Sequence, residues 1–193
     1  MRALHTRGPL RAASGVSLLE IAFAIGLVAA LVGVVAGTTG RRDDGGHAGQ
    51  VVQTVESLRR ACASYRIDTC SFATELTGHA AMHRQLSANP GVAGWHGPYL
   101  ETPLSGAQNP WGGRIDLYDD VRANGWIQGF DLDGNGELDA QTEANMLVLE
   151  AVPAPGASAI DAALERGAPG EWMASGRVRY DALAQRLYVL VLP

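Results

Sequence analysis

The chain contains no lysine, and all fifteen basic residues among its 193 are arginines. Chemistry that depends on a lysine amine, such as Schiff-base catalysis or phosphate binding by a P-loop, is therefore excluded. The net charge is −5 at pH 7. Basic residues do not gather into a patch with interleaved aromatic residues, so we expect no nucleic-acid partner. The length is sufficient for one domain, or for one domain and an anchor.

Cysteine is also scarce, with Cys62 and Cys70 as the only two. In an exported domain, a pair so close in sequence favours a small disulfide loop. Such a loop would stabilise the fold by about 2.5 kcal/mol in the chain-entropy model. The alternative is two free thiols, one of them on the buried face of a helix. The sequence therefore predicts a Cys62–Cys70 disulfide, conditional on export.

Charge is absent from a long apolar run over 21–37. Residues 16–37 provide about 22 helical positions, enough to cross a bilayer. Glu20 stands inside this stretch, where an ionised carboxylate costs roughly 2.5–3.5 kcal/mol. A secretory signal cleaved near 34–36 and a plain single-span anchor both leave Glu20 without a nearby cation. Cleavage after Gly15 would instead create a free amine on Val16, at a helix N-terminus that favours negative charge.

Residues 15–20 read Gly-Val-Ser-Leu-Leu-Glu, which resembles the G-F-T-L-I-E signature of type IV pilins and type II secretion pseudopilins. The chain departs from it at Val16, where Phe or Met is usual. The resemblance implies that a prepilin peptidase cuts after Gly15 and methylates the new N-terminus. It also implies that Glu20 pairs with the amine of a neighbouring subunit during assembly. The implied fold is α+β: a long N-terminal helix, half membrane-embedded and half amphipathic, packed on a small antiparallel sheet that forms a pilin-like head.

The helix is expected to continue beyond the membrane. Apolar residues recur every three or four positions over 50–66, which indicates a helix with one face in a core: Val51, Val52, Val55, Leu58, Cys62 and Tyr65. Five glycines within 37–49 each cost up to about 1 kcal/mol of helix propensity, so we expect the helix to be melted or kinked there. Residues 71–86 are expected to form a second helix. Its His79 and His83 lack the glutamate of a zinc protease motif and are interpreted as surface residues.

Residues 94–113 combine turn formers with aromatic side chains, which indicates an ordered loop rather than a linker. The segment resembles the G-P-Y-L…D-P-W-G stretch of major pseudopilins, with Asn109 in place of Asp. Strands are predicted over 114–118, 126–130 and 146–152, a short helix over 160–166, and a hairpin over 177–192. The chain is thus divided into a leader over 1–15, a stalk helix over 16–66 and a head over 67–193. The expected anchors of the loop are Trp95, Pro98, Tyr99, Pro110 and Trp111.

An acidic loop over 131–143 carries a pattern typical of calcium ligands. Oxygen-bearing side chains alternate around Gly136, as in an EF-hand loop: Asp131, Asp133, Asn135, Glu137 and Asp139. The ligand at the seventh position of such a loop is a backbone carbonyl, so the side chain of Glu137 need not bind. The alternative is an acidic turn built on Asp-Gly and Asn-Gly. Major pseudopilins similar to this chain bind a structural calcium after their P-W-G segment, and this resemblance favours a structural Ca²⁺ here.

Together these features predict a structural subunit of a type IV pilus or type II secretion pseudopilus, and not an enzyme. The implied partners are the prepilin peptidase, other pilin or pseudopilin subunits in a helical polymer, and an inner-membrane assembly platform. The implied location is the bacterial inner membrane with a periplasmic head, and then a filament in the periplasm or on the cell surface. The alternative is a membrane-tethered, calcium-dependent binding or adhesion module. A hydrolase that uses His79 and His83 is disfavoured, because no nucleophile stands in a recognisable catalytic context.

Overall fold

The computed structural model describes residues 18–165 and 173–193, and within the first helix it describes side chains at 21–23, at 25 and from 45 onward. The chain divides into two compact units, Met1–Arg41 and Arg42–Pro193. The expected leader over 1–15, with Gly15, and the expected new N-terminus at Val16 lie outside the described residues. Glu20 lies in the first helix, but its side chain is not among those described.

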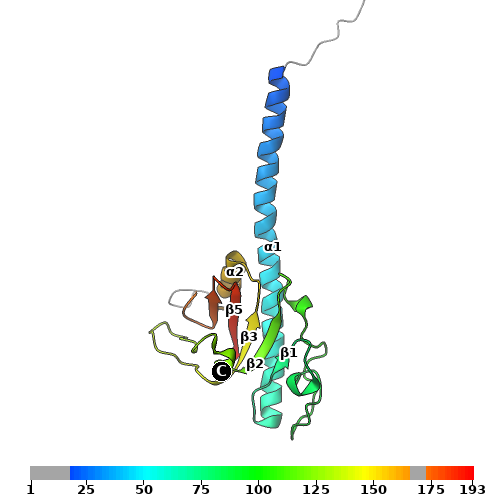
Figure 1. Cartoon of the computed structure of the whole chain (residues 1–193), viewed down its shortest axis with the longest axis vertical. Coiled ribbons are helices and arrows are strands. Elements are labelled where there is room, and N and C mark those ends of the chain that lie inside the picture. Colours follow the sequence, from blue (N-terminus) through cyan, green and yellow to red (C-terminus); the bar gives the residue numbers. More distant parts are fainter. Residues whose placement is uncertain (1–17, 166–172) are drawn as a thin grey trace, which may run out of the picture. The chain divides into compact units, whose positions relative to one another are not determined.

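The first helix, α1, extends over Leu18–Thr69 and contributes to both units (Figure 1). In the described part of the chain, no helix is both long and apolar enough to cross a membrane. The backbone is helical throughout 37–49, where the sequence predicted a melted or kinked helix, so no melted segment is seen. Propagation adds one hydrogen bond for each residue that is fixed, and a long helix therefore tolerates glycines that would prevent a short one.

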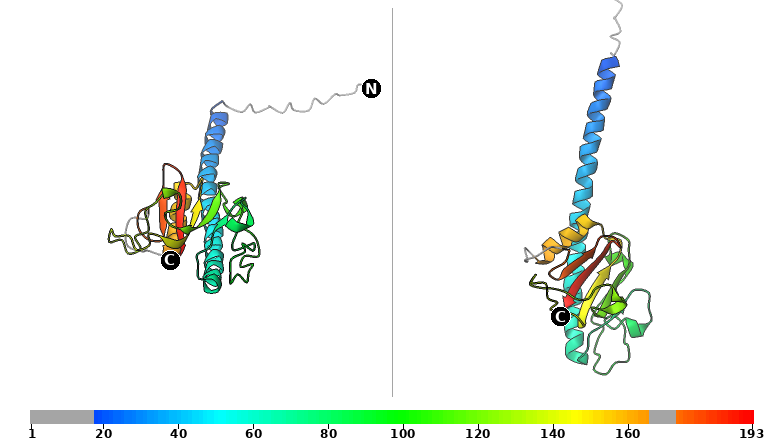
Figure 2. Two further views of the ribbon diagram at one scale, coloured as in Figure 1. Left: turned by 60° about the horizontal axis from the view of Figure 1, so that its bottom comes forward. Right: turned by 60° about the vertical axis from the view of Figure 1, so that its left-hand side comes forward.

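The second unit contains, among its described residues, an antiparallel sheet of five strands in the order β1-β2-β3-β5-β4 (Figure 1). A second helix, α2 (Ala154–Glu165), lies beside the β4 side of the sheet (Figure 2). The sequence predicted this combination of a helix with an antiparallel sheet for the head. The strands are β1 (Glu75–Leu76), β2 (Ile115–Asp120), β3 (Glu143–Leu149), β4 (Val178–Asp181) and β5 (Arg186–Leu192). Short 3-10 turns occupy Ala81–His83, Gly106–Gln108 and Ala123–Gly125.

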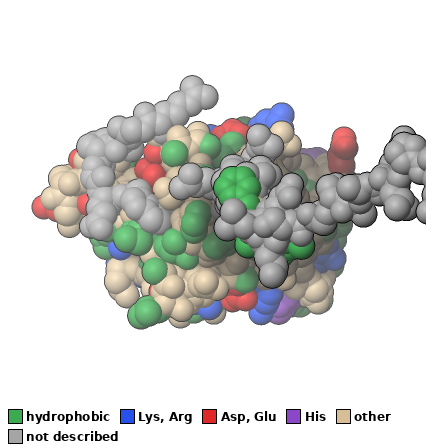
Figure 3. Space-filling view, turned by 90° about the horizontal axis from the view of Figure 1, so that it is seen from above, with side chains coloured by type: hydrophobic (Ala, Val, Ile, Leu, Met, Phe, Trp, Pro, Cys, Tyr) green, Lys and Arg blue, Asp and Glu red, His purple; other side chains and the backbone are tan. Residues whose placement is uncertain are grey.

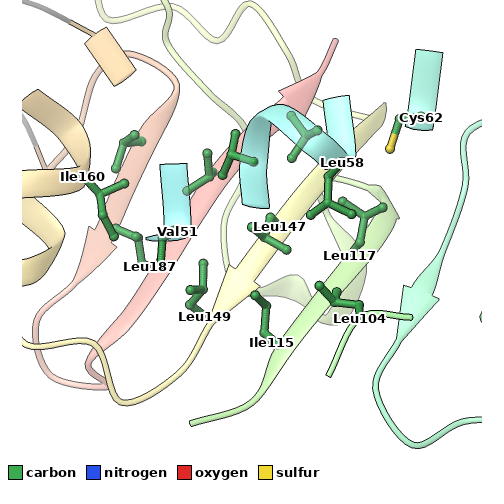
Figure 4. Close-up of a cluster of buried hydrophobic side chains, with 14 of the residues drawn as sticks. Val51, Leu58, Cys62, Leu104, Ile115, Leu117, Leu147, Leu149, Ile160 and Leu187 are labelled. Carbon is green, nitrogen blue, oxygen red and sulfur yellow. The ribbon is translucent and has the colours of Figure 1, made fainter. Parts of the chain in front are cut away.

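The core of the second unit lies between one face of α1 and the inner face of the sheet (Figure 4). Five of the six residues that the sequence predicted on the core face of α1 are buried, and Val52 is half-buried. The five are Val51, Val55, Leu58, Cys62 and Tyr65, and Ala48 and Ala61 are buried with them. They meet alternate strand residues, whose side chains share one face of the sheet: Ile115, Leu117, Leu147, Leu149, Leu187 and Val189. Each large aliphatic side chain buried here stabilises the fold by about 1.5–3 kcal/mol, so this interface holds the second half of α1 on the sheet.

A second cluster of buried side chains covers the outer face of the same strands. Met146, Val148 and Tyr188 belong to it, and the segment between β2 and β3 folds over them through Val121 and Phe130. Both faces of β3 and β5 are consequently covered. This explains why the two strands consist of nearly continuous apolar residues instead of alternating ones.

The predicted C-terminal hairpin is present as β4 and β5, which pair antiparallel. Two other segments differ from the expectation. Residues 71–86 form β1 and a 3-10 turn in place of a helix, with Gly78 at a φ of +79°. Residues 126–130, expected to be a strand, contribute only the bridge between Phe130 and Ala140. Pairing of β1 with the distant β2 determines the first difference, because strand formation depends on non-local partners more than on local propensity.

The predicted Cys62–Cys70 disulfide is not formed, and both cysteines are free thiols. Cys62 lies on the buried face of α1, whereas Cys70 directly follows the helix and is exposed. Eight helical positions separate the two residues by about 12 Å along the axis, while a disulfide requires Cα atoms within about 7 Å. The prediction was wrong because α1 continues to Thr69, past the expected end at Arg66. Burial, with a smaller contribution from Glu75, raises the pKa of the Cys62 thiol to about 12.

Candidate functional site

The segment over 94–113 is attached to the C-terminal end of α1 by its aromatic residues. Trp95 and Tyr99 pack edge to face with ring centroids 5.9 Å apart. The Tyr99 hydroxyl donates to Asp68 Oδ2 at 2.8 Å, and Trp95 Nε1 donates to the carbonyl of Gln85 at 2.8 Å. Pro98 stands between the two aromatic residues and follows a cis peptide bond. These contacts tie the segment to the last turn of α1.

Asn109 closes the other end of the same segment on the sheet. Its side chain is only 2% exposed, and its Nδ2 donates to the carbonyls of Arg114 (3.1 Å) and Glu150 (2.8 Å). Its Oδ1 accepts a hydrogen bond from Trp111 N at 3.2 Å, across the intervening Pro110. An amide can donate and accept at once, whereas a carboxylate only accepts. An aspartate at this position could accept from Trp111 N but could not donate to the two carbonyls, so the Asn109 amide makes bonds that a carboxylate could not.

Trp111 links the segment to both helices. Its ring packs edge to face on His47 of α1, with centroids 5.5 Å apart. On α2, Gly156 leaves room for the same ring, because a Cβ built at Gly156 would lie 2.4 Å from Trp111 Cζ2. The three aromatic residues among the predicted anchors, Trp95, Tyr99 and Trp111, thus pack against the core. An anchoring role for Pro98 and Pro110 stays a prediction.

An open groove of about 710 Å³ lies between α1 and the 98–108 part of this segment. Ser57, Arg60 and Ser64 line it from the helix, and Glu101 and Gln108 line it from the loop. No histidine or cysteine lines it, so its serines lack the adjacent base that activates a nucleophile.

The face of the molecule seen from above shows acidic, basic and hydrophobic side chains interspersed (Figure 3).

The acidic loop is closed at its base by backbone hydrogen bonds. Phe130 N donates to Ala140 O at 2.8 Å, and Asp139 N donates to Phe130 O at 2.8 Å. Within the loop, Gly134 and Gly136 adopt φ values of +74° and +91°. Glycine adopts these values without steric cost, so the backbone turns sharply enough to bring acidic side chains together.

Three carboxylates converge in this loop. Asp131, Asp133 and Asp139 each place one oxygen within 4.8 Å of the others. Ca²⁺ binds oxygens at about 2.3–2.6 Å, so oxygens at these separations are able to share one ion. Burial alone would raise the pKa of the Asp131 carboxyl, but hydrogen bonds from the N–H groups of Gly136 and Gly134 lower it below its usual value. The group is therefore held ionised.

The other two predicted ligands, Asn135 and Glu137, make hydrogen bonds within the loop. Asn135 Oδ1 accepts a hydrogen bond from Glu137 N at 2.7 Å, and Asn135 Nδ2 donates to Asp133 Oδ2 at 3.0 Å. The Glu137 carboxylate is not part of the converging group. Asp139 Oδ2 also accepts a hydrogen bond, from Leu132 N at 2.7 Å. The three aspartates among the five predicted residues thus come together, and their hard oxygen donors fit a cation such as Ca²⁺. Ligation by Asn135 and by the backbone carbonyl of Glu137 stays a prediction.

The structure also contains a buried carboxylate that the sequence did not single out. Glu75 is 0% exposed, and its Oε2 accepts hydrogen bonds from Leu86 N (3.0 Å) and Ser87 N (3.2 Å). The Ser87 hydroxyl donates to Oε1, and the Arg84 guanidinium lies 3.6 Å away. Glu75 thereby fixes the segment that follows the histidine-containing turn. No sequence pattern could have revealed it, because its partners meet it only in the folded chain.

A helix packed on an antiparallel sheet, with an aromatic loop that contacts the end of the helix, is consistent with a pilin-like head. The chain is 32% identical over 129 residues to the type II secretion system core protein G of Xanthomonas campestris pv. campestris, an alignment that covers 66% of this chain and 81% of that protein. The chain therefore belongs to the family of the type II secretion system core protein G, a family of pseudopilins. No family model matches the chain. No solved structure matches it.

Proposed function

We propose that the chain is a structural subunit of a type II secretion pseudopilus, assembled into a helical filament through its N-terminal helix. The observation that carries this proposal is the 32% identity over 129 residues to a type II secretion core protein. The head is consistent with the same role, because α1 packs on the sheet through a buried core.

The N-terminal signature supports processing after Gly15. The backbone is helical from Leu18 onward, so Glu20 lies in the first turn of α1, where unpaired N–H groups and the helix dipole favour a negative charge. In the uncleaved chain the nearest preceding basic residue is Arg11, nine positions away and out of helical reach. After cleavage, the amine of Val16 on a neighbouring subunit becomes the ion-pair partner of Glu20, and the pair sets the register between subunits.

The proposed partners and location follow from cleavage after Gly15 and assembly through Glu20. A prepilin peptidase removes residues 1–15 and methylates the new N-terminus, and an inner-membrane assembly platform then passes the subunit to other pseudopilins. The uncharged run over 21–37 supports insertion of the precursor in the bacterial inner membrane, with the head in the periplasm.

The processing step is tested by the intact mass of the chain isolated from cells that contain a complete type II secretion system. We expect loss of residues 1–15 and one added methyl group on Val16. An uncut chain, or a new N-terminus near residue 37, would contradict the proposal.

The pairing role of Glu20 is tested by Glu20→Ala. Processing and thermal stability should be unchanged, while incorporation into sedimentable filaments should be lost. Glu56→Ala is the matched control, because Glu56 is an exposed carboxylate on the same helix, paired with Arg59 at 2.6 Å. Normal assembly of Glu20→Ala, or an equal defect in both variants, would refute the pairing.

We further propose that the acidic loop holds a structural Ca²⁺ through Asp131, Asp133 and Asp139. The support is the convergence of three carboxylate oxygens within 4.8 Å of one another. A bound ion supplies positive charge that offsets the mutual repulsion of these groups. Gly176 N, in the segment before β4, donates a hydrogen bond to the carbonyl of Asp131 at 2.6 Å. The order of the loop therefore affects the neighbouring hairpin.

Chelation provides the test of the calcium proposal. Free Ca²⁺ at about a hundred times the Kd would stabilise the fold by about 2.7 kcal/mol, so EGTA should lower the Tm of the chain. Asp133→Ala should abolish this response. Glu137→Ala, an acidic residue of the same loop outside the converging group, should retain it. A Tm that is the same in Ca²⁺ and in EGTA would mean that the loop is an acidic turn without an ion.

A further inference from the structure

Two exposed imidazoles lie next to each other in the turn that follows β1. The ring centroids of His79 and His83 are 5.8 Å apart, and the ring planes make an angle of 84°. Neither imidazole makes a hydrogen bond or an ion pair with any residue in the described ranges 18–165 and 173–193. Their ring nitrogens are therefore available to an external ligand.

The backbone fixes the positions of the two rings. His79 N donates to the carbonyl of Leu76 at 3.3 Å, and His83 N donates to the carbonyl of Ala80 at 2.9 Å. The buried carboxylate of Glu75 holds the segment immediately beyond this turn. Because the turn is already ordered, a ligand that bridges the rings would lose little affinity to ordering the chain.

The separation of the rings suits a shared metal ion. Zn²⁺ binds an imidazole nitrogen at about 2.0–2.1 Å, which places the centroids of two rings on one tetrahedral ion about 5 Å apart. The observed centroid distance is 5.8 Å. Small χ rotations of the two exposed side chains are enough to bring the rings to the shorter distance. The two rings are thus close enough to share one ion once their side chains have rotated.

The charges around the pair are compatible with a cation. Arg84 is paired with Glu75 at 3.6 Å, and Arg114, which borders the same cavity as His79, is paired with Asp116 at 2.9 Å. A further carboxylate, that of Asp119, lies near His83. Burial raises the pKa of Asp119, and the interaction with His83 acts in the opposite direction.

We propose that His79 and His83 form a metal site for a borderline divalent ion such as Zn²⁺, with water completing the coordination. Its donors distinguish it from the acidic loop, because imidazole nitrogen suits Zn²⁺, Ni²⁺ and Cu²⁺, whereas carboxylate oxygen suits Ca²⁺. The site would fasten the turn after β1. It does not depend on the proposed role in a pseudopilus.

The test is a calorimetric titration of the purified full chain with Zn²⁺ in excess Ca²⁺. We expect one site, with affinity lowered by at least about tenfold in His79→Ala and in His83→Ala, since loss of even an outer partner of a metal ligand costs that much. His96→Ala is the matched control, because His96 is exposed and stands apart from the pair. Asp133→Ala controls for the acidic loop. Both controls should bind Zn²⁺ as the unchanged chain does.

Histidine NMR signals supply the structural readout. Addition of Zn²⁺ should shift the ring signals of His79 and His83 together, and the shifts should reverse at acid pH because protons compete for the ring nitrogens. The proposal is overturned if either single variant binds Zn²⁺ with unchanged affinity. It is equally overturned if Asp133→Ala, and not the histidine variants, lowers the Zn²⁺ affinity. A loss of affinity in His96→Ala as large as in His79→Ala and His83→Ala would overturn it as well.

Discussion

Asp161 on α2 is a carboxylate whose ionisation opposes folding. Burial, followed by repulsion from Glu165 one turn later, raises its pKa from 3.8 to about 6. Its Oδ1 is buried without a hydrogen-bond partner among the described residues. The folded state consequently binds more protons than the unfolded state between about pH 4 and pH 6. Stability from this group is therefore full below about pH 4 and is lost as the pH rises through 6.

Asp161→Asn should remove this pH-dependent penalty. A pKa raised from 3.8 to about 6 corresponds to at most about 3 kcal/mol. We reduce this figure to about 1 kcal/mol because the side chain is partly solvated and its interactions are screened. At pH 7.5 the variant should then be about 1 kcal/mol more stable than the unchanged chain, or about 2–4 °C higher in Tm. Near pH 4 the two should be equally stable.

The assay is urea unfolding followed by tryptophan fluorescence at several values of pH between 4 and 7.5. Carboxyl NMR of the folded chain gives an independent midpoint for Asp161, expected near pH 6. Glu101→Gln, which removes an exposed carboxylate, is the control and should show no pH-dependent difference. A variant that is less stable at pH 7.5, or a stability difference that does not vary with pH, would refute the reasoning.

Two further predictions concern the frame around the core. Asn109→Ala removes the donor to two backbone carbonyls in a buried site, so it should lower the free energy of unfolding by about 1–3 kcal/mol in urea, and a loss below about 0.5 kcal/mol would show that water replaces the amide. Leu58→Ala opens a cavity under α1 and should cost about 2–5 kcal/mol, whereas Ile67→Ala on the same helix, where the side chain is 79% exposed, should change stability by less than about 0.5 kcal/mol. Equal effects of the two α1 substitutions would contradict the assigned core face.

Features with a local pattern could be predicted from the sequence. The core face of α1 follows from the spacing of Val51, Val55 and Leu58, because helical periodicity is set within three or four residues. The hairpin of β4 and β5 follows from an alternating segment and an apolar run separated by a short turn. The acidic loop was visible for the same reason, since its ligand-bearing residues and glycines are contiguous.

Features that depend on distant partners could not be predicted. Residues 71–86 had helical spacing, but Glu75–Leu76 pairs with β2, some forty positions away. The disulfide was predicted from the short separation of Cys62 and Cys70, and the extension of α1 to Thr69 placed the two thiols too far apart along the helix. In both cases the long-range packing of the chain outweighed a local preference.

The sequence by itself determined the N-terminal signature with Glu20 and the apolar run that follows it. It also determined the order of helix, aromatic loop and strands. Each of these features depends only on residues that are neighbours in the sequence. Only the tertiary structure decided that the Glu75 carboxylate is buried and hydrogen-bonded, and that the rings of His79 and His83 lie 5.8 Å apart. It also decided that Asp161 Oδ1 is buried without a hydrogen-bond partner among the described residues. Burial and distance between side chains are properties of the packed chain, in which residues far apart in sequence set one another's surroundings.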